Sequence, residues 1–155
     1  MLRKKTMTTT LVIVTIVLAA YFYRIYSQNT QVPKLGIENG LLAPVSKKPN
    51  NVSSQARIDD KKVAPLAFKE TPEATMNAIK KAVENYGGAT VKEETSFYFY
   101  VVFTTALMKY NDDVEFWLDT EKKQVHFRSS SRAGYSDMGL NRKRYDKLAE
   151  LYLAQ

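Results

Sequence analysis

Cysteine is absent from the 155 residues of this sequence, and histidine occurs once, at His126. The absence of cysteine excludes disulfide bonds, thiolate metal ligands and cysteine nucleophiles. Because metal sites need several convergent ligands, a lone histidine is more typical of a surface residue than of a ligand or a catalytic base. The sequence also lacks a phosphate-loop pattern, a dinucleotide-binding glycine pattern and a serine with a convincing histidine partner. We therefore expect no cofactor, no metal ion and no assignable catalytic residue.

Acidic residues are absent from the first 26 positions, which hold four of the 23 basic residues. The rest of the chain carries 19 basic and 16 acidic residues, a net charge of +3. Most of the basic bias therefore belongs to the N-terminal segment, where it bears on membrane topology. A charge of +3 over the remaining residues counts against nucleic-acid binding.

A long uncharged run separates Lys5 from Arg24. As a helix, its eighteen residues would rise about 27 Å, close to the roughly 30 Å hydrocarbon core of a bilayer. Three basic residues precede the run and only Arg24 closely follows it, so the positive-inside rule keeps the N-terminus cytoplasmic. We expect a single-pass protein of the bacterial inner membrane with a periplasmic or other extracytoplasmic domain. Its parts would be a basic tail (residues 1–5), a transmembrane signal anchor (6–26), a tether (27–41) and an α+β domain (42–155).

Two other interpretations of the apolar run remain open. It could be a cleaved signal peptide, since the strongly apolar part from Leu11 to Ala20 is short and Ala20 could occupy a cleavage position. It could also be a buried helix of a soluble protein. The first alternative still puts the domain outside the cytoplasm.

Residues 27–62 are rich in polar residues, proline and glycine, which break any regular period. Their apolar residues are too many for a freely solvated linker, so part of this segment should lie against the domain. The apolar residues concerned are Leu35, Ile37, Leu41, Leu42 and Val45.

The expected domain begins with an amphipathic helix over residues 72–86. Thr71 and Pro72 are a typical N-cap and first position, and Gly87 ends the pattern. A strand is expected over residues 89–94. The apolar and aromatic residues on both faces of the strand expected over residues 96–105 favour a central strand.

Two alternating segments then predict a hairpin with one buried face. Pairing Leu118 with Val125 places Glu115 opposite Arg128 and Trp117 opposite His126. We expect Glu115 and Arg128 to form an ion pair on a solvated face, worth less than about 1 kcal/mol. The preceding "NDD" could bind Ca²⁺ or Mg²⁺ through Asp112 and Asp113, but turn chemistry is the commoner role.

A last helix is expected after Asn141, its proposed cap, with one apolar stripe along it. The stripe consists of Tyr145, Leu148, Ala149 and Tyr152. The predicted fold is α+β: an antiparallel sheet of three to four strands flanked by two helices on one side, preceded by the transmembrane helix.

Residues 133–140 should form a tight loop between the last strand and the last helix, since Gly134 and Gly139 permit positive φ. A loop before a helix N-terminus can direct backbone amides and arginines at an anion, so a carboxylate, phosphate or sugar acid is a reasonable ligand. Cations at the start of the last helix oppose its macrodipole and favour an anionic partner, although Asp137 or Asp146 could neutralise them instead. The candidate ligand-binding residues are Asp113, Arg128, Arg132, Tyr135, Asp137, Asn141 and Arg142.

Several stretches together resemble the uncharacterised DUF1499 family of bacterial and plastid domains. They are "PNNVSS" (residues 49–54), "APL" (64–66), "DDVEF" (112–116) and "RSSSRAGYSDMGLNRKR" (128–144). The resemblance covers about residues 42–153 and implies that the "PNNVSS" segment belongs to the domain. It assigns no reaction. Many members carry cysteines where this chain has Ala43 and Asn51, so a thiol role in relatives would be absent here.

The sequence favours a membrane-anchored binding or accessory module of the cell envelope that recognises an anionic group or a partner protein. The alternative is a hydrolase or transferase acting on an anionic envelope substrate. It would use Asp113 or Asp137 as acid or base, with Arg128 and Arg132 as electrostatic stabilisers. A purely structural role is the third possibility.

Overall fold

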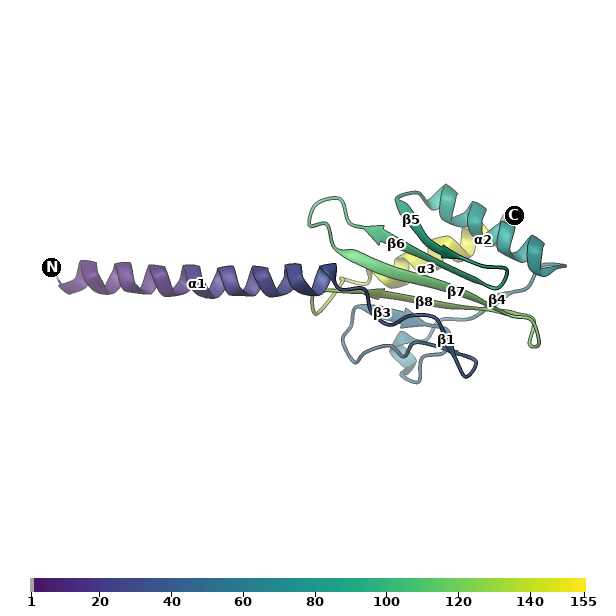
Figure 1. Ribbon diagram of the computed structural model, residues 1–155, viewed down its shortest axis with the longest axis horizontal. Coiled ribbons are helices and arrows are strands. Elements are labelled where there is room, and N and C mark those ends of the chain that lie inside the picture. The colour runs from purple at the N-terminus through teal and green to yellow at the C-terminus, as the bar shows by residue number, and fades with distance from the viewer. Residues whose placement is uncertain (1) are drawn as a thin grey trace.

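A computed structural model describes residues 2–155, with side chains from residue 7 onward. A long helix, α1 (Leu2–Thr30), projects from an α+β domain (Figure 1). Its segment Met7–Thr30 is long and apolar enough to cross a membrane, and none of its apolar window is buried against the domain. The expected N-terminal apolar helix is therefore present and continues through residues 27–30. Met1, part of the expected basic tail, lies outside the described residues.

The main sheet has six strands in which every pairing is antiparallel. Its order is β3-β8-β7-β6-β5, and β4 also pairs with β8. The strands are β3 (Asn51–Ser53), β4 (Leu66–Ala67), β5 (Ala89–Glu94), β6 (Tyr98–Thr104), β7 (Asn111–Asp119) and β8 (Gln124–Ser131). The expectation of three to four strands is wrong because β3 and β4, two short segments before the first domain helix, add to the free edge of β8.

Helix α2 (Pro72–Tyr86) has the predicted bounds. The Thr71 hydroxyl accepts a hydrogen bond from the Ala74 amide at 3.1 Å, and Pro72 occupies the first turn, where its missing N–H costs nothing. Gly87 follows at φ 77°, a conformation that glycine adopts without steric strain. The local rules for starting and ending a helix therefore apply fully here.

The helices α2 and α3 (Leu140–Leu153) cover one face of the sheet, which we call the helix face (Figure 1). The main core lies between them and the sheet. It includes the predicted apolar stripe of α3 and, from α2 and the hairpin, Met76, Ile79, Val83, Val114, Phe116, Leu118, Val125 and Phe127. The predicted α+β class is thereby confirmed.

The opposite face of the sheet is covered by the arm, which we define as residues 31–50 between α1 and β3 (Figure 1). The arm contains a small hairpin of β1 (Ile37–Glu38) and β2 (Leu41–Leu42). Its Leu35 and Leu42 pack with Tyr98, Tyr100 and Val102 in a second apolar cluster. A short 3-10 helix, η1 (Asp59–Lys61), lies between β3 and β4. We call the face of the main sheet that the arm covers the arm face.

The hairpin of β7 and β8 has the predicted register. Leu118 pairs with Val125, Trp117 with His126, and Glu115 with Arg128. The predicted environment of its polar face is wrong, however, because the arm removes this face from water.

Candidate functional site

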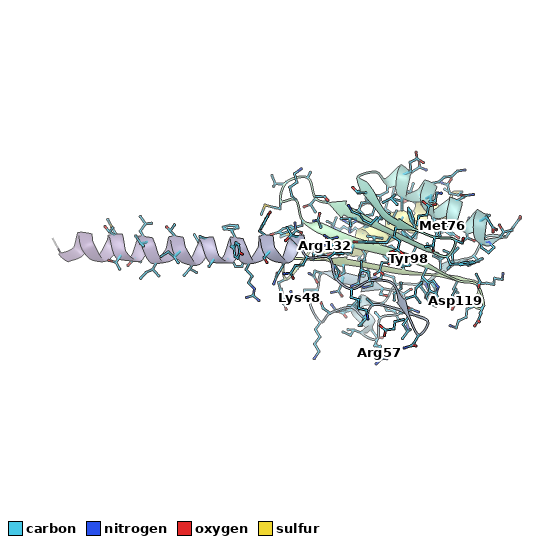
Figure 2. The ribbon with its side chains drawn as sticks, viewed as in Figure 1. Lys48, Arg57, Met76, Tyr98, Asp119 and Arg132 are labelled. Atoms are coloured by element: carbon cyan, nitrogen blue, oxygen red, sulfur yellow. The ribbon has the colours of Figure 1, made fainter. Side chains whose placement is uncertain are left out.

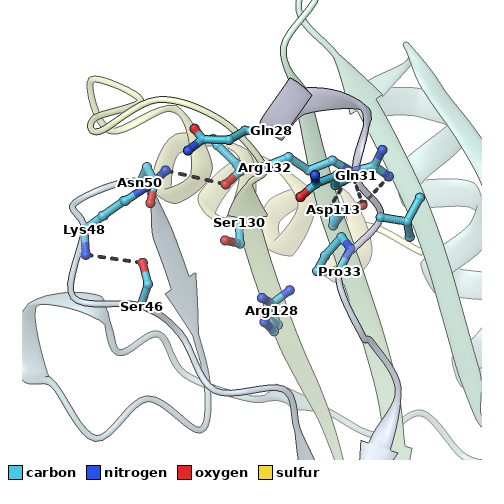
Figure 3. A pocket seen from close by; sticks show the side chains of 12 residues that line it. Gln28, Gln31, Pro33, Ser46, Lys48, Asn50, Asp113, Arg128, Ser130 and Arg132 are labelled. Carbon is cyan, nitrogen blue, oxygen red and sulfur yellow. Dashed lines mark hydrogen bonds and ion pairs between the residues drawn. The ribbon is translucent and has the colours of Figure 1, made fainter. Parts of the chain in front are cut away.

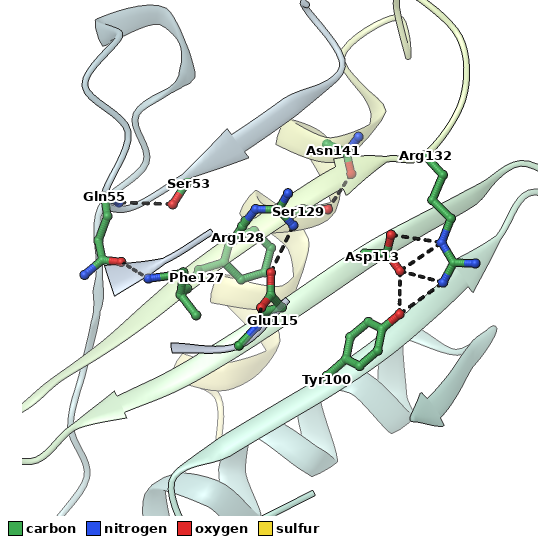
Figure 4. A network of polar contacts seen from close by, with 12 residues as sticks. Ser53, Gln55, Tyr100, Asp113, Glu115, Phe127, Arg128, Ser129, Arg132 and Asn141 are labelled. Atoms are coloured by element: carbon green, nitrogen blue, oxygen red, sulfur yellow. Dashed lines mark hydrogen bonds and ion pairs between the residues drawn. The ribbon is translucent and has the colours of Figure 1, made fainter. Parts of the chain in front are cut away.

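Glu115 and Arg128 form a buried ion pair beneath the arm (Figure 4). Arg128 Nη1 donates to Glu115 Oε2 at 2.9 Å, and the two side chains are 7% and 0% exposed, respectively. The other carboxylate oxygen accepts from the Tyr98 hydroxyl at 2.7 Å and from the Gly36 amide at 2.9 Å. Since Gly36 belongs to the arm, this carboxylate ties the arm to the sheet. The pair is not the weak solvated one that the alternation suggested.

A second buried network joins Asp113, Arg132 and Tyr100 (Figure 4). Arg132 Nη2 and Nε donate to the Asp113 carboxylate at 2.7 and 2.9 Å, a two-point contact that fixes the guanidinium plane. The Tyr100 hydroxyl donates to Asp113 Oδ1 at 2.6 Å and accepts from Arg132 Nη2 at 3.0 Å. These hydrogen bonds to Asp113 raise the pKa of Arg132 further above its ordinary value.

The two tyrosines of this face remain protonated. Burial, together with the adjacent Glu115 carboxylate, raises the pKa of the Tyr98 phenol far above its ordinary value. Burial and the hydrogen bond to Asp113 do the same to the pKa of Tyr100. Each phenol therefore serves as a hydrogen-bond donor to a buried carboxylate.

A pocket of about 330 Å³ opens where the end of α1, the arm and the ends of β7 and β8 meet (Figure 3). This volume falls at the lower end of the range for small-molecule sites. Three cations and one carboxylate line it, along with several amides and hydroxyls. The lining residues are Gln28, Gln31, Val32, Pro33, Ser46, Lys48, Asn50, Asp113, Arg128, Ser130, Ser131 and Arg132.

Arg128 has hydrogen-bonding capacity that the described part of the chain does not use. Its Nη1 is bonded to Glu115, but its buried Nε has no hydrogen-bond partner among the described residues. A buried donor without a partner calls for a physical explanation, since such groups are rare in folded proteins. The Nε of Arg144 is also unpartnered, but Arg144 lines no part of this pocket. Arg128, by contrast, has an unpartnered Nε and also lines the pocket.

The structure brings together three of the seven predicted site residues, Asp113, Arg128 and Arg132, and separates the other four from them. Tyr135 is exposed at the tip of the β8–α3 loop. Arg142 donates instead to the backbone carbonyls of Asp60 and Lys62. None of the four lines the pocket.

Asp137 and Asn141 belong to a polar cluster at the start of α3 on the helix face. Asp137 Oδ2 accepts from the backbone amide and the side-chain amide of Asn141, each at 2.7 Å. The N-cap of α3 is Gly139, so the expectation that Asn141 is the cap is wrong. Asn141 is fully buried, and its side chain also contacts Ser129 and the Asn50 carbonyl.

Asp112 also belongs to this helix-face cluster, since Arg144 Nη2 donates to its carboxylate at 2.7 Å and both side chains are buried. Asp112 and Asp113 are successive residues of β7, so they point to opposite faces of the sheet. The turn role predicted for "NDD" is therefore wrong, and the two carboxylates cannot share an ion. No cluster of three metal-ligating His, Asp or Glu side chains occurs among the described residues.

His126 is buried rather than exposed, and its ring stacks on Trp117 with centroids 5.0 Å apart. The Ser54 hydroxyl is 3.2 Å from His126 Nδ1, and Asp119 Oδ2 is 3.7 Å from Nε2. Ser54, His126 and Asp119 are thus arranged like the nucleophile, base and acid of a catalytic triad. The sequence analysis did not predict this arrangement. However, Ser54 Oγ accepts the Phe127 amide at 2.9 Å, and Ser54 and His126 do not line the pocket. The Ser54 hydroxyl is therefore engaged with the backbone of β8.

This trio predicts a pH dependence of stability. Burial lowers the pKa of His126, although the Asp119 charge opposes the shift. The unfolded chain therefore takes up a proton first as the pH falls below about 6.5, so stability is lost on acidification. We expect the thermal midpoint to fall between about pH 7 and 5.5, and His126→Phe, which keeps a ring against Trp117, to remove most of this slope. The lowered pKa of Asp119, which is due chiefly to the Lys122 amide, acts only in the lower, carboxyl range. An unchanged slope in the variant would contradict the assignment.

Several pocket residues escaped the sequence analysis. Ser46, Lys48 and Asn50 belong to a segment without regular periodicity, and Gln28 and Gln31 were assigned to a tether. The available signals were the apolar content of the arm and the family resemblance of residues 49–54, which indicated contact with the domain but not with which face. Ser130 lies on the same face of β8 as Arg128, a face that the sequence analysis expected to be solvated.

The structure defines an α+β domain that carries a polar pocket at the end of a helix long enough to span a membrane. The chain belongs to the family described as "Protein of unknown function (DUF1499)", whose model matches residues 41–151. The match covers 111 of 155 residues and confirms the resemblance seen in the motifs. No curated protein and no solved structure matches the chain.

Proposed function

We propose that this protein is a membrane-anchored binding module of the cell envelope whose pocket beneath the arm recognises an anionic group. Arg128 is the observation that carries the proposal. Its guanidinium is almost completely buried, borders the pocket and retains an unpartnered Nε–H. An anion in the pocket would face this guanidinium, of which only Nη1 is engaged by a carboxylate. Lys48 would add a charge that no carboxylate of the described residues neutralises.

The charge balance around the pocket supports a ligand with one negative charge. Lys48, Arg128 and Arg132 supply three positive charges, whereas Asp113 and Glu115 supply two negative ones. The two buried ion pairs hold the arginines rigidly, so an anion would meet donors that are already ordered.

Catalysis is less well supported than binding. Asp113, the expected acid or base, already accepts hydrogen bonds from Arg132 and Tyr100. Asp137, the other candidate, binds the start of α3. A general base needs a free carboxylate within reach of a substrate proton, and neither residue offers one.

The test is thermal unfolding of the full-length chain in neutral detergent micelles with inorganic phosphate, sulfate or glucuronate. Trp117, the sole tryptophan, reports on the domain. An anion at 100 times its dissociation constant should add about 2.7 kcal/mol of stability. Lys48→Glu should weaken binding at least about tenfold, since one hydrogen bond to a charged group contributes about 1.5–3 kcal/mol.

Lys47→Glu is the matched control, because Lys47 is also exposed and does not line the pocket. It makes the same charge change one residue away and should leave binding within about twofold, the effect of screened surface charge. Equal losses in the two variants, or no stabilisation by any of the three anions, would overturn the proposal.

A further inference from the structure

The pocket lies at the level of the membrane surface if α1 spans the bilayer. Arg24 is the first charged residue after the apolar run, and Gln28, which lines the pocket, follows it by about 6 Å of helical rise. The headgroup layer on each side of the hydrocarbon core is about 5–7 Å thick. The pocket therefore begins where the headgroups end.

The end of α1 is fixed to the domain rather than joined by a flexible tether. The Asn29 side chain donates to the Lys109 carbonyl at 2.8 Å and accepts from the Asn111 amide at 2.7 Å. The Asn111 side chain returns a hydrogen bond to the Asn29 carbonyl at 3.2 Å. These contacts keep one end of the domain next to α1 and therefore facing the membrane. Lys48 and Arg132 are at this end in Figure 2, whereas Asp119 is at the other.

Two loops at this end carry exposed apolar side chains. The β6–β7 loop presents Leu107, which is 90% exposed, and Met108, next to the Lys109 that contacts α1. The β8–α3 loop presents Tyr135 and Met138, the latter 91% exposed. Both loops lie beside the last turn of α1 in Figure 1. Apolar tips that flank a basic pocket at a membrane surface are suited to the interfacial layer, which accepts apolar and aromatic groups.

We propose that this end of the domain rests on the bilayer with both loops in the interface, and that the pocket binds the phosphate of an anionic phospholipid headgroup. The inference rests on the proposed anion-binding function and specifies its ligand. Phosphate matches the hydrogen-bond donors around Arg128, and Lys48 favours a lipid with net negative charge over a zwitterionic one.

The position of the domain is tested with the full-length chain in lipid nanodiscs. Because the sequence has no cysteine, Leu107→Cys can be labelled uniquely with a fluorophore, and nitroxide-bearing lipids then report its proximity. Phe97→Cys, in the exposed turn at the opposite end of β6, is the control. We expect strong quenching at position 107 and little at position 97. Equal quenching at the two positions would overturn the docked arrangement.

The ligand is tested by thermal unfolding in nanodiscs of phosphatidylcholine with or without phosphatidylglycerol. Phosphatidylglycerol should raise the midpoint of the wild type and of Lys47→Glu, and Lys48→Glu should require about tenfold more of it. If inorganic phosphate stabilises the protein in micelles but phosphatidylglycerol has no effect, the lipid inference fails and the anion-binding function stands. If none of phosphate, sulfate and glucuronate stabilises the protein in micelles and phosphatidylglycerol also has no effect, both fail.

Discussion

Arg144→Met is expected to destabilise the domain by about 3–5 kcal/mol, the usual cost of removing one partner of a buried ion pair. Asp112 is 1% exposed, and Arg144 is its salt-bridge partner. Without the guanidinium, Asp112 would remain as a carboxylate without a counter-charge, between β7 and α3. The measurement is urea unfolding of the full-length chain in micelles, followed by Trp117 fluorescence.

Two comparisons separate the lost charge partner from lost packing. Lys147→Met changes an exposed pair on the same helix, with Glu150, and should cost less than about 1 kcal/mol. The double variant Asp112→Leu/Arg144→Met replaces the whole pair with apolar groups and should recover more than half of the loss. A single variant that costs no more than Lys147→Met, or a double variant that is less stable than the single one, would contradict this account.

The helix-face pair shows why part of the fold could be predicted from sequence and part could not. Cations near the start of α3 oppose the helix macrodipole, a misfit that predicted either an anionic ligand or a neighbouring acid as the compensating charge. The partner of Arg144 proved to be Asp112 on β7, rather than a nearby acid such as Asp146. Local rules detect that a charge needs compensation, but they do not locate a partner 32 residues away in the chain.

The hairpin could be predicted in detail because its information is local. Alternation in β7 and β8 defines two faces, and one register places Phe116 opposite Phe127 in the core. The strands β3 and β4 were missed because segments of three and two residues have no measurable period. They form only because β8 offers unpaired backbone groups along its edge.

The burial of the arm face was partly foreseeable. Tyr98, Tyr100 and Val102 place apolar groups on the second face of β6, and the apolar residues of the arm needed a surface to cover. Together these features indicate a covered second face. Charges at Asp113 and Glu115 pointed instead to solvent, because buried carboxylates are uncommon without partners. The predicted register already paired Glu115 with Arg128. How much an ion pair contributes to stability, however, depends on whether it is buried, and here the arm buries it.

Glu115→Ala is expected to cost about 3–5 kcal/mol and to release the arm from the sheet. The substitution leaves the Arg128 guanidinium buried without a counter-charge and removes the acceptor of both the Tyr98 hydroxyl and the Gly36 amide. Urea unfolding measures the stability, and hydrogen exchange of the Gly36 amide reports on arm docking. We expect faster exchange at Gly36 under conditions where the core strands remain protected.

Tyr98→Phe is the matched variant, because it removes one hydrogen bond to the same carboxylate and retains the Glu115 to Arg128 pair. It should cost about 1 kcal/mol and leave the Gly36 amide protected. Val32 and Pro33 line the pocket just before Gly36, so release of the arm should also weaken anion binding, whereas Tyr98→Phe should preserve it. A Glu115→Ala chain that keeps both Gly36 protection and anion affinity would show that the arm docks without this carboxylate. The apolar contacts of Leu35 and Leu42 and the hydrogen bonds of Gln55 to the arm would then suffice to hold the pocket wall.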